Sequence, residues 1–222
     1  MKTQALLLAA VVTMASTSGT LHETWREFAV NAVLPEQTAS GNWLARFSGY
    51  GRISVVSDPL FGNALELAPK PAGASSETHA ALVTTLDSFE DFDATVQMNT
   101  LRQSKSSPGP GDVGWFLWRY SDNQHFYYFS LKPNGWELGK EDPGYKRSQR
   151  FLSSGTEPHL VLGTPNVVRV VQRSATIWVY VDGQSVTQFS DLERPYFLGS
   201  LGLYCEDSIV RFGSVNVIET TP

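Results

Sequence analysis

His125 and Tyr127 are separated by one residue in an extended, aromatic-rich part of the chain. Because side chains alternate between the two faces of a strand, this spacing predicts that the imidazole and the phenol lie on one face. Such a pair can take up and deliver a proton. Arg119, in the preceding extended segment, could neutralise a negative group beside them. We therefore treat His125, Tyr127 and Arg119 as candidate catalytic residues.

The segment 114–140 must position these side chains, and it is predicted to form three adjacent strands. Two β-prone runs, 125–132 and 136–140, are joined by Pro133-Asn134-Gly135, and Asn-Gly between such runs is a strong hairpin signal. On the middle strand, alternation separates Phe126, Tyr128, Ser130 and Lys132 from His125, Tyr127, Phe129 and Leu131. One face can pack a core while the other meets a ligand. We favour the face of His125 and Tyr127 for the ligand groove.

A second strand is expected to contribute polar side chains to this groove. The segment 89–100 alternates apolar residues with Asp93, Thr95, Gln97 and Asn99. We expect Gln97 and Asn99 to converge with Arg119, His125, Tyr128 and Lys132. The candidate substrate-binding residues are Gln97, Asn99, Arg102, Trp118, Gln124, Tyr128, Lys132, Trp136 and Lys140.

The whole chain is typical of an all-β protein. It has 222 residues, of which 41% are hydrophobic and 18% charged, enough for one well-buried domain. Short β-prone runs recur throughout, and no segment has helical periodicity over a useful length. The sequence predicts an antiparallel β-sandwich of jelly-roll type over residues 20–222, formed by two sheets packed face to face.

The N-terminal segment 1–19 has the build of a signal peptide. Lys2 precedes an apolar run, and small residues follow at Ala15, Ser16 and Ser18. The run is too short to span a bilayer, so we expect a secreted, extracellular monomer with no membrane span. The single cysteine, Cys205, cannot form an internal disulfide and is expected to be buried. A net charge of −5 argues against nucleic acid as a partner.

Several strings in the chain resemble a known superfamily. The order 114–120, then Phe126-Tyr127-Tyr128-Phe129, then Asn134-Gly135 and 136–140 is similar to laminin-G-like members of the concanavalin A-like lectin/glucanase superfamily. The runs 179–183 and 199–204 resemble the second half of the same domains. The resemblance covers roughly 89–217. The resemblance implies a jelly-roll β-sandwich whose concave sheet often contacts sugars. It specifies the fold better than the activity.

Within this superfamily, polysaccharide lyases suggest a role for the candidate catalytic residues. Cleaving a uronic-acid polymer by β-elimination needs a cation or amide at the carboxyl group, a base and an acid. Lyases similar to alginate and glucuronan lyases use Arg, Gln or Asn, His and Tyr. The lyase strings Arg-Thr-Glu-x-Arg and Gln-Ile-His are absent from this chain. Our working hypothesis is a secreted lyase acting on a uronic-acid-containing extracellular polysaccharide or oligosaccharide.

Other functions remain open. The first alternative is a non-catalytic, lectin-like carbohydrate-binding or adhesion module, because six tryptophans and eight tyrosines suit stacking on sugars. The second is a glycoside hydrolase. The glucanase motif Glu-x-Asp-x-x-Glu is absent from this chain. The nearest acidic cluster is Glu137, Glu141 and Asp142, which a solvated turn would equally explain. The third is a matrix protein. If these side chains have only a structural role, Tyr127 packs in the core and His125 is a strand residue with satisfied hydrogen bonds.

No cofactor is required by these hypotheses. The histidines, His22, His79, His125 and His159, lack zinc-like spacing. The resemblance implies that a structural Ca²⁺ ion could bind through carboxylates between the terminal strands. Candidate contributors are Glu23, Glu27, Asp58 and Asp207.

Overall fold

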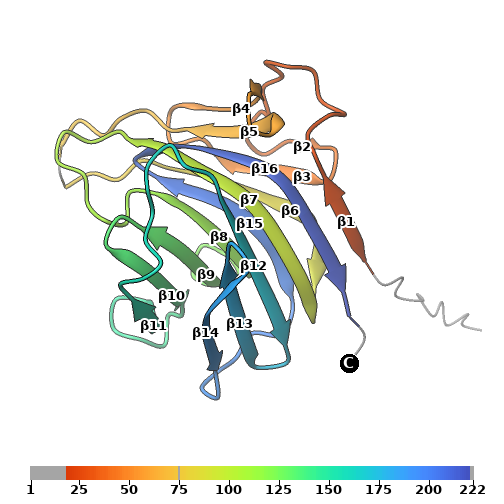
Figure 1. The fold of residues 1–222 in the computed structure, drawn as a ribbon, viewed down its shortest axis with the longest axis vertical. Helices are drawn as coiled ribbons and strands as arrows, with labels where there is room; N and C mark the ends of the chain where they lie inside the picture. Colours follow the sequence, from red (N-terminus) through yellow and green to blue (C-terminus); the bar gives the residue numbers. More distant parts are fainter. Residues whose placement is uncertain (1–18, 75, 221–222) are drawn as a thin grey trace, which may run out of the picture.

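Two antiparallel β-sheets pack against each other in the computed structural model, which describes residues 19–74 and 76–220 (Figure 1). The antiparallel jelly-roll sandwich predicted from the sequence is confirmed. The predicted signal peptide lies outside the described residues except for Gly19, and the division into a signal peptide and one domain stays a prediction. No described helix is long and apolar enough to cross a membrane.

The first sheet, sheet A, has the strand order β14-β13-β12-β7-β16-β5-β4, and β1 also pairs with β16. Its strands are β1 (Thr20–Glu23), β4 (Arg52–Asp58), β5 (Gly62–Ala68), β7 (Phe92–Gln103), β12 (Asn166–Arg173), β13 (Thr176–Val181), β14 (Gln184–Ser190) and β16 (Ser208–Glu219).

The second sheet, sheet B, has the order β11-β10-β9-β8-β15-β6-β3-β2. Its strands are β2 (Ala39–Ser40), β3 (Trp43–Phe47), β6 (Ala80–Phe89), β8 (Gly114–Asp122), β9 (His125–Lys132), β10 (Gly135–Glu141), β11 (Gln149–Gly155) and β15 (Gly199–Glu206). The central segment therefore forms three neighbouring strands, as its hairpin signals predict.

Alternation along the strands builds the core between the two sheets. On β7, Phe92, Ala94 and Val96 are fully buried, while the residues between them are half-buried on the outer face. Cys205 is also buried, as predicted, and burial raises the pKa of its thiol. The β9–β10 turn needs glycine at Gly135, whose φ is +130° and whose added β-carbon would collide with the Gly155 carbonyl.

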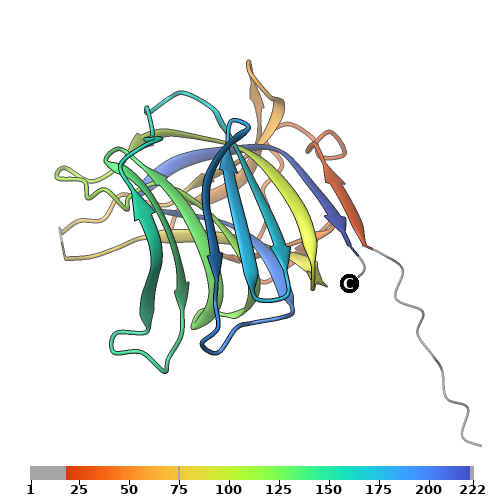
Figure 2. The same cartoon turned by 60° about the horizontal axis from the view of Figure 1, so that its bottom comes forward.

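The loop that leads from β14 to β15 is seen as a ribbon in Figure 2. A buried ionic network ties sheet B to this loop. The carboxylate of Asp191 is fully buried and accepts hydrogen bonds from the Tyr127 hydroxyl at 2.6 Å, Lys140 Nζ at 2.7 Å and Arg150 Nη1 at 3.0 Å. Lys140 also donates to the carbonyls of Glu193 and Arg194. Side chains of β9, β10 and β11 thus converge on one carboxylate of the loop.

The network keeps Asp191 charged although it is buried. Burial raises the pKa of this carboxyl, but hydrogen bonds from Lys140 and Tyr127 outweigh burial and hold the pKa below its ordinary value of 3.8. The unfolded chain binds more protons than the folded protein as the pH falls. The stabilisation is therefore present above about pH 4 and is lost as the pH drops through the depressed pKa.

We predict that Asp191→Ala destabilises the protein by about 3–5 kcal/mol, because it leaves the Lys140 ammonium buried without its partner. Urea unfolding at neutral pH measures the change. Asp93→Ala is the matched control, since Asp93 pairs with Arg169 at the surface and such pairs contribute about 0–1 kcal/mol. Equal effects of the two variants would contradict the importance of the network.

Candidate functional site

The outer face of sheet B is hollowed into a groove of about 390 Å³. Its walls come from seven neighbouring strands, β11, β10, β9, β8, β15, β6 and β3, so the sheet must curve around it. We call this hollow the concave groove. Its lining residues are Phe47, Leu82, Trp115, Leu117, Tyr120, Asn123, Phe126, Glu141, Gln149, Tyr204 and Glu206.

A continuous row of aromatic rings crosses the concave groove. Phe47 lies edge-on to Tyr204 with ring centroids 6.5 Å apart, and Tyr204 lies edge-on to Trp115 at 5.4 Å. Trp115 is 4.6 Å from Tyr128, whose ring is 6.4 Å from Phe126. Tyr128 is fully buried and Trp115 is 8% exposed, so Phe47, Tyr204 and Phe126 provide most of the open apolar surface of the row, of the kind that packs against flat ligands.

One carboxylate beside the row is already paired. Glu137 accepts a hydrogen bond from the Tyr128 hydroxyl at 2.6 Å and from Lys132 Nζ at 2.5 Å. Gln149 Nε2 donates to the same Tyr128 hydroxyl at 2.8 Å. These contacts connect β9, β10 and β11 across the outer face and hold the phenol of Tyr128 in place.

Two other carboxyl groups of the groove, Glu141 and Glu206, have raised pKa values. Burial, followed by repulsion from Glu206, raises the pKa of Glu141 to about 7. Burial also raises the pKa of Glu206, against the hydrogen bond that its carboxyl accepts from the Tyr204 hydroxyl at 2.6 Å. Among the described residues, no side chain donates a hydrogen bond to the Glu141 carboxyl group, whereas the Tyr196 hydroxyl donates to the Glu141 backbone carbonyl at 2.7 Å. A cation borders the groove, because the Arg46 guanidinium lies 5.6 Å from the centroid of the lining Tyr120 ring.

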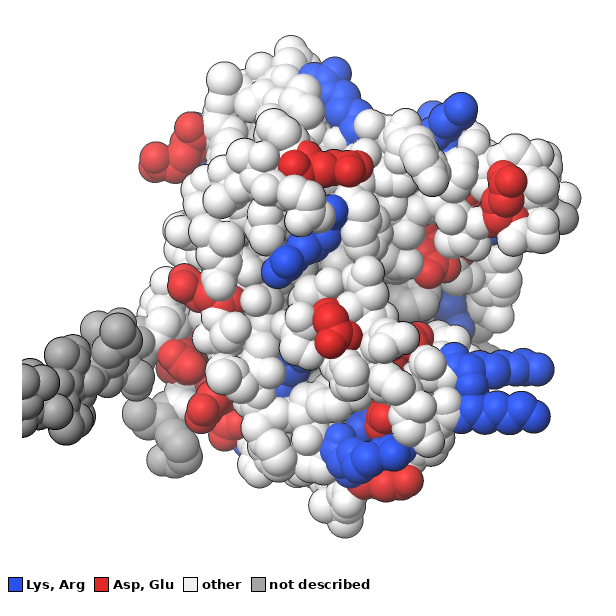
Figure 3. Space-filling view, turned by 180° about the vertical axis from the view of Figure 1, so that it is seen from behind, with Lys and Arg blue, Asp and Glu red and all other residues white. Residues whose placement is uncertain are grey.

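The charges on this side of the molecule are mixed. Seen from behind, acidic and basic side chains are interspersed with uncharged surface instead of forming one large patch of a single sign (Figure 3). The electrostatic character of the groove is therefore local, and it depends on Glu141, Glu206 and the neighbouring Arg46.

The candidate catalytic residues do not meet in the concave groove. Tyr127 is buried on the core face, where its hydroxyl is bonded to Asp191. Arg119 has φ of +50° at an irregularity in β8, is 1% exposed, and donates to buried carbonyls and to Asp91. The predicted alternation on β9 is correct, but our choice of its ligand-binding face was wrong, because Tyr127 has its polar partner inside the core.

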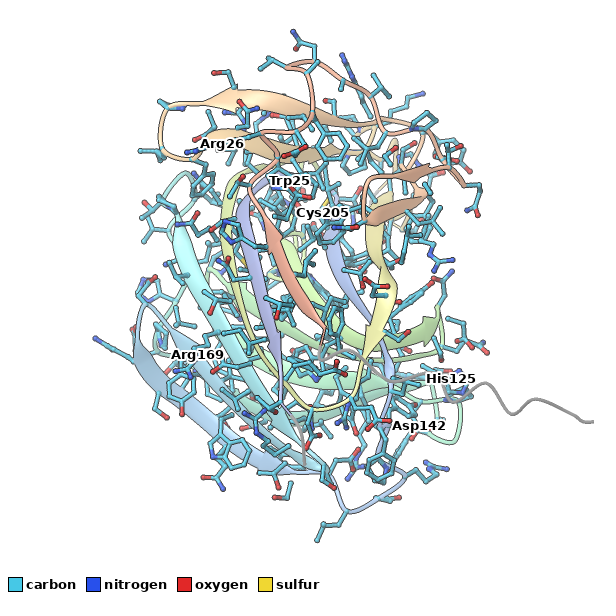
Figure 4. All side chains as sticks on the ribbon, turned by 90° about the vertical axis from the view of Figure 1, so that its right-hand side faces the viewer. Trp25, Arg26, His125, Asp142, Arg169 and Cys205 are labelled. Atoms are coloured by element: carbon cyan, nitrogen blue, oxygen red, sulfur yellow. The ribbon has the colours of Figure 1, made fainter. Side chains whose placement is uncertain are left out.

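His125 lies apart from that core at the end of β9. Its Nδ1 is 2.8 Å from a carboxylate oxygen of Asp122, and its ring meets Tyr196 edge-on. Figure 4 shows His125 at the rim of the molecule, away from Cys205 between the sheets. It shares no contact with Tyr127 that would make an acid/base pair.

The predicted convergence with the strand at 89–100 is also wrong. Gln97, Asn99 and Arg102 all lie on β7, which belongs to sheet A, whereas the groove is formed by sheet B. Gln97 accepts hydrogen bonds from Ser214, and Asn99 is 2% exposed. Alternation on β7 identified its polar face correctly but carried no information about which sheet the strand joins.

Three more candidate binding residues are core residues. Trp118 donates its indole hydrogen to Gln172 at 2.8 Å, Trp136 donates to the Glu157 carbonyl at 2.8 Å, and Lys140 binds Asp191. They point inward because each alternates in step with the other core-facing residues of its own strand.

The other three candidates have different surroundings. Tyr128 and Lys132 lie on the concave face, as their contacts with Glu137 show. Gln124 is exposed in the turn between β8 and β9. Of the nine predicted binding residues, Tyr128 and Lys132 alone are thus held by contacts beside the groove.

Sequence reasoning missed Tyr204 and Glu206, although a signal was present. Both alternate with the buried residues Leu203 and Cys205 on β15, so they share the outer face. Phe47 gave no such signal, because the register of β3 shifts between Ala45 and Phe47.

The candidate calcium ligands do not form one site. Glu23 accepts hydrogen bonds from the backbone of Trp25 and the indole of Trp43, Asp58 pairs with Arg211, and Asp207 pairs with Lys105. Glu27 lines a hollow that Glu23 also lines, apart from Asp58 and Asp207. Across residues 19–74 and 76–220, no three His, Cys, Asp or Glu residues are grouped to hold a metal ion.

Several solved structures share the fold of this chain. The carbohydrate-binding module CBM66 from Bacillus subtilis matches 83% of this chain and 100% of its own, with 13% identity and a TM-score of 0.59. A native glycosidic hydrolase matches 94% and 100%, with 14% identity and a TM-score of 0.59. A Bacillus licheniformis β-glucanase matches 87% and 100%, with 11% identity and a TM-score of 0.53.

At these identities the likeness establishes the fold alone. No protein-family model matches the chain, and no curated protein matches its sequence.

We predict that Glu141 titrates near pH 7 and that Glu206→Gln lowers its pKa, because the substitution removes a like charge. Burial is the larger cause, so the pKa should remain above 4.5 in the variant. Carboxyl-carbon NMR titration measures both values. Glu27→Gln, in a different hollow, is the control and should change nothing. A wild-type Glu141 that titrates at its ordinary value would contradict this description of the groove.

Proposed function

We propose that this protein is a secreted glycan-binding protein and that its concave groove takes a neutral polysaccharide or oligosaccharide. The observation that carries the proposal is the unbroken row of rings from Phe47 to Phe126, with polar groups along its edges. Sugar rings have flat apolar faces and hydroxyl edges, so they match such a surface. A carbohydrate-binding module and glycan-hydrolysing enzymes share the fold, which supports the proposal.

The charge of the groove favours a neutral glycan over a uronate polymer. Once ionised, Glu141 and Glu206 would repel a uronate carboxylate. Arg46 borders the hollow over the Tyr120 ring, and its Nε already donates to Thr84 at 2.9 Å. Lys132, on the same face, is already paired with Glu137. The buried Arg119 and Tyr127 cannot reach a substrate there, so β-elimination by the residues first considered has no support.

Glycoside hydrolysis is the second candidate, and the raised pKa of Glu141 favours it. A carboxyl group with a pKa of about 7 keeps its proton near neutral pH and can protonate a glycosidic oxygen. Hydrolysis needs a second carboxyl group, in ionised form, as nucleophile or base. Glu206 is the neighbouring carboxyl in the groove.

We predict that Phe126→Ala weakens neutral-glycan binding about tenfold or more, since losing the contact of one aromatic face removes about 1.5–3 kcal/mol. Affinity electrophoresis against mixed-linkage β-glucan, xylan, galactomannan and alginate tests the proposal, and alginate should not bind. Tyr180→Ala, on the outer face of sheet A, is the matched aromatic control and should bind normally. Binding of alginate alone, or equal losses in both variants, would overturn the proposal.

If the protein also hydrolyses its glycan, Glu141→Gln should abolish the release of reducing ends while binding persists, because the amide cannot donate the proton. The wild-type rate should fall as the pH rises above about 7, where Glu141 is ionised. A reducing-end assay on each polysaccharide that binds measures this. A wild type that binds without releasing reducing ends is a binding protein only.

A further inference from the structure

The concave groove continues into a second hollow of about 450 Å³. Phe47 lines both hollows. The junction also runs along the paired strands β6 and β15, because Ala80 in the second hollow is the register partner of Glu206 in the first. The other lining residues of the second hollow are Glu36, Gly49, Tyr50, Thr78 and His79.

An exposed aromatic ring stands over this second hollow. Tyr50 is 83% exposed, and its ring centroid is 5.1 Å from that of His79, which it meets edge-on. The imidazole is fixed in turn, because its Nδ1 is 2.6 Å from the Lys70 carbonyl and its backbone amide donates to Asp207. The Tyr50 ring is thus largely open to solvent while it contacts a fixed imidazole.

The backbone holds Tyr50 in a conformation that bulky residues rarely adopt. Its φ is +60°, in the left-handed region, where strain of about 1–3 kcal/mol is retained mainly at functional sites. The glycines on both sides, Gly49 and Gly51, let the loop pack closely against the two sheets. A β-carbon at Gly49 would collide with the Ala80 carbonyl, and one at Gly51 would collide with the Ala68 carbonyl. The backbone that carries the exposed ring is therefore packed closely against both sheets.

The second hollow also offers a charged hydrogen-bond acceptor. The side chain and backbone of Ser48 donate to Glu36 Oε1, and these bonds hold the pKa of Glu36 below its ordinary value. An ionised carboxylate beside an open aromatic ring is suited to a sugar unit with free hydroxyl groups. It is unsuited to an anionic one.

We infer that the occupant of the groove is an internal stretch of an extended polysaccharide chain, and that Tyr50 is a distal platform for it. The inference rests on the proposed function and adds that the bound glycan is long enough to occupy both hollows. Each hollow alone has the size of a small-ligand site, so a molecule that fills both across Phe47 must be an oligomer. Such a chain crosses the strands of sheet B from β11 to the loop after β3.

Calorimetry with β-glucan fragments separated by length, from the disaccharide upward, tests this inference. Wild-type affinity should rise with length until both hollows are filled. Tyr50→Ala should remove that rise, weakening the longest fragments about tenfold, whereas Tyr50→Phe keeps the ring and should retain it. Phe126→Ala should weaken fragments of every length, and Tyr180→Ala should weaken none.

The outcomes separate the two proposals. If wild type binds short and long fragments equally and Tyr50→Ala changes neither, the distal platform is wrong while the groove stands. If Tyr180→Ala weakens binding as much as Phe126→Ala does, or if no fragment binds and no neutral polysaccharide is retained in electrophoresis, the proposed function itself is wrong. Because Tyr50 makes few packing contacts, an unchanged thermal midpoint in Tyr50→Ala shows that its effect is local.

Discussion

The buried carboxylate of Asp191 determines which side of sheet B faces outward. A charge removed from water must be neutralised by close partners, and here the partners come from β9, β10 and β11. Tyr127, Lys140 and Arg150 point inward to reach Asp191. Because successive side chains of a strand point to opposite faces, the adjacent residues Tyr128, Glu141 and Gln149 lie on the outer face. The polar and aromatic surface of the groove is thus a consequence of a contact inside the protein.

The same constraint separates charges of opposite sign. Lys140 and Arg150 are drawn toward Asp191, Arg119 donates to the Ser174 carbonyl, and Lys132, the cation of β9 on the outer face, is paired with Glu137. Glu141 is left on the outer face, where β15 adds Glu206. Partial burial without a cation raises the pKa of Glu141. The ring-lined groove with its two carboxyl groups and the core network around Asp191 are two faces of the same strands.

The sequence predicted local structure well because alternation and turn residues are local signals. The hairpin at Asn134-Gly135, the two faces of β9 and the polar face of β7 are all confirmed. The ligand-binding face of β9 could not be deduced, since its choice depends on Asp191, which lies 64 residues from Tyr127 in the chain. Irregular register at Arg119 and Phe47 breaks the alternation, and pairing between distant strands placed β7 in the other sheet.

Binding and turnover would depend on different parts of the groove. An aromatic floor contacts a sugar chain equally before and during bond cleavage, so it supplies affinity without accelerating a reaction. Acceleration requires a group whose interaction strengthens as the glycosidic oxygen gains negative charge, and a protonated carboxyl group is such a donor. If the proposed hydrolysis takes place, that role would fall to Glu141, whose pKa is raised to about 7 by burial and by Glu206. A sheet of this kind can therefore shift between binding and hydrolysis through the surroundings of one carboxyl group, while the rings that hold the glycan stay the same.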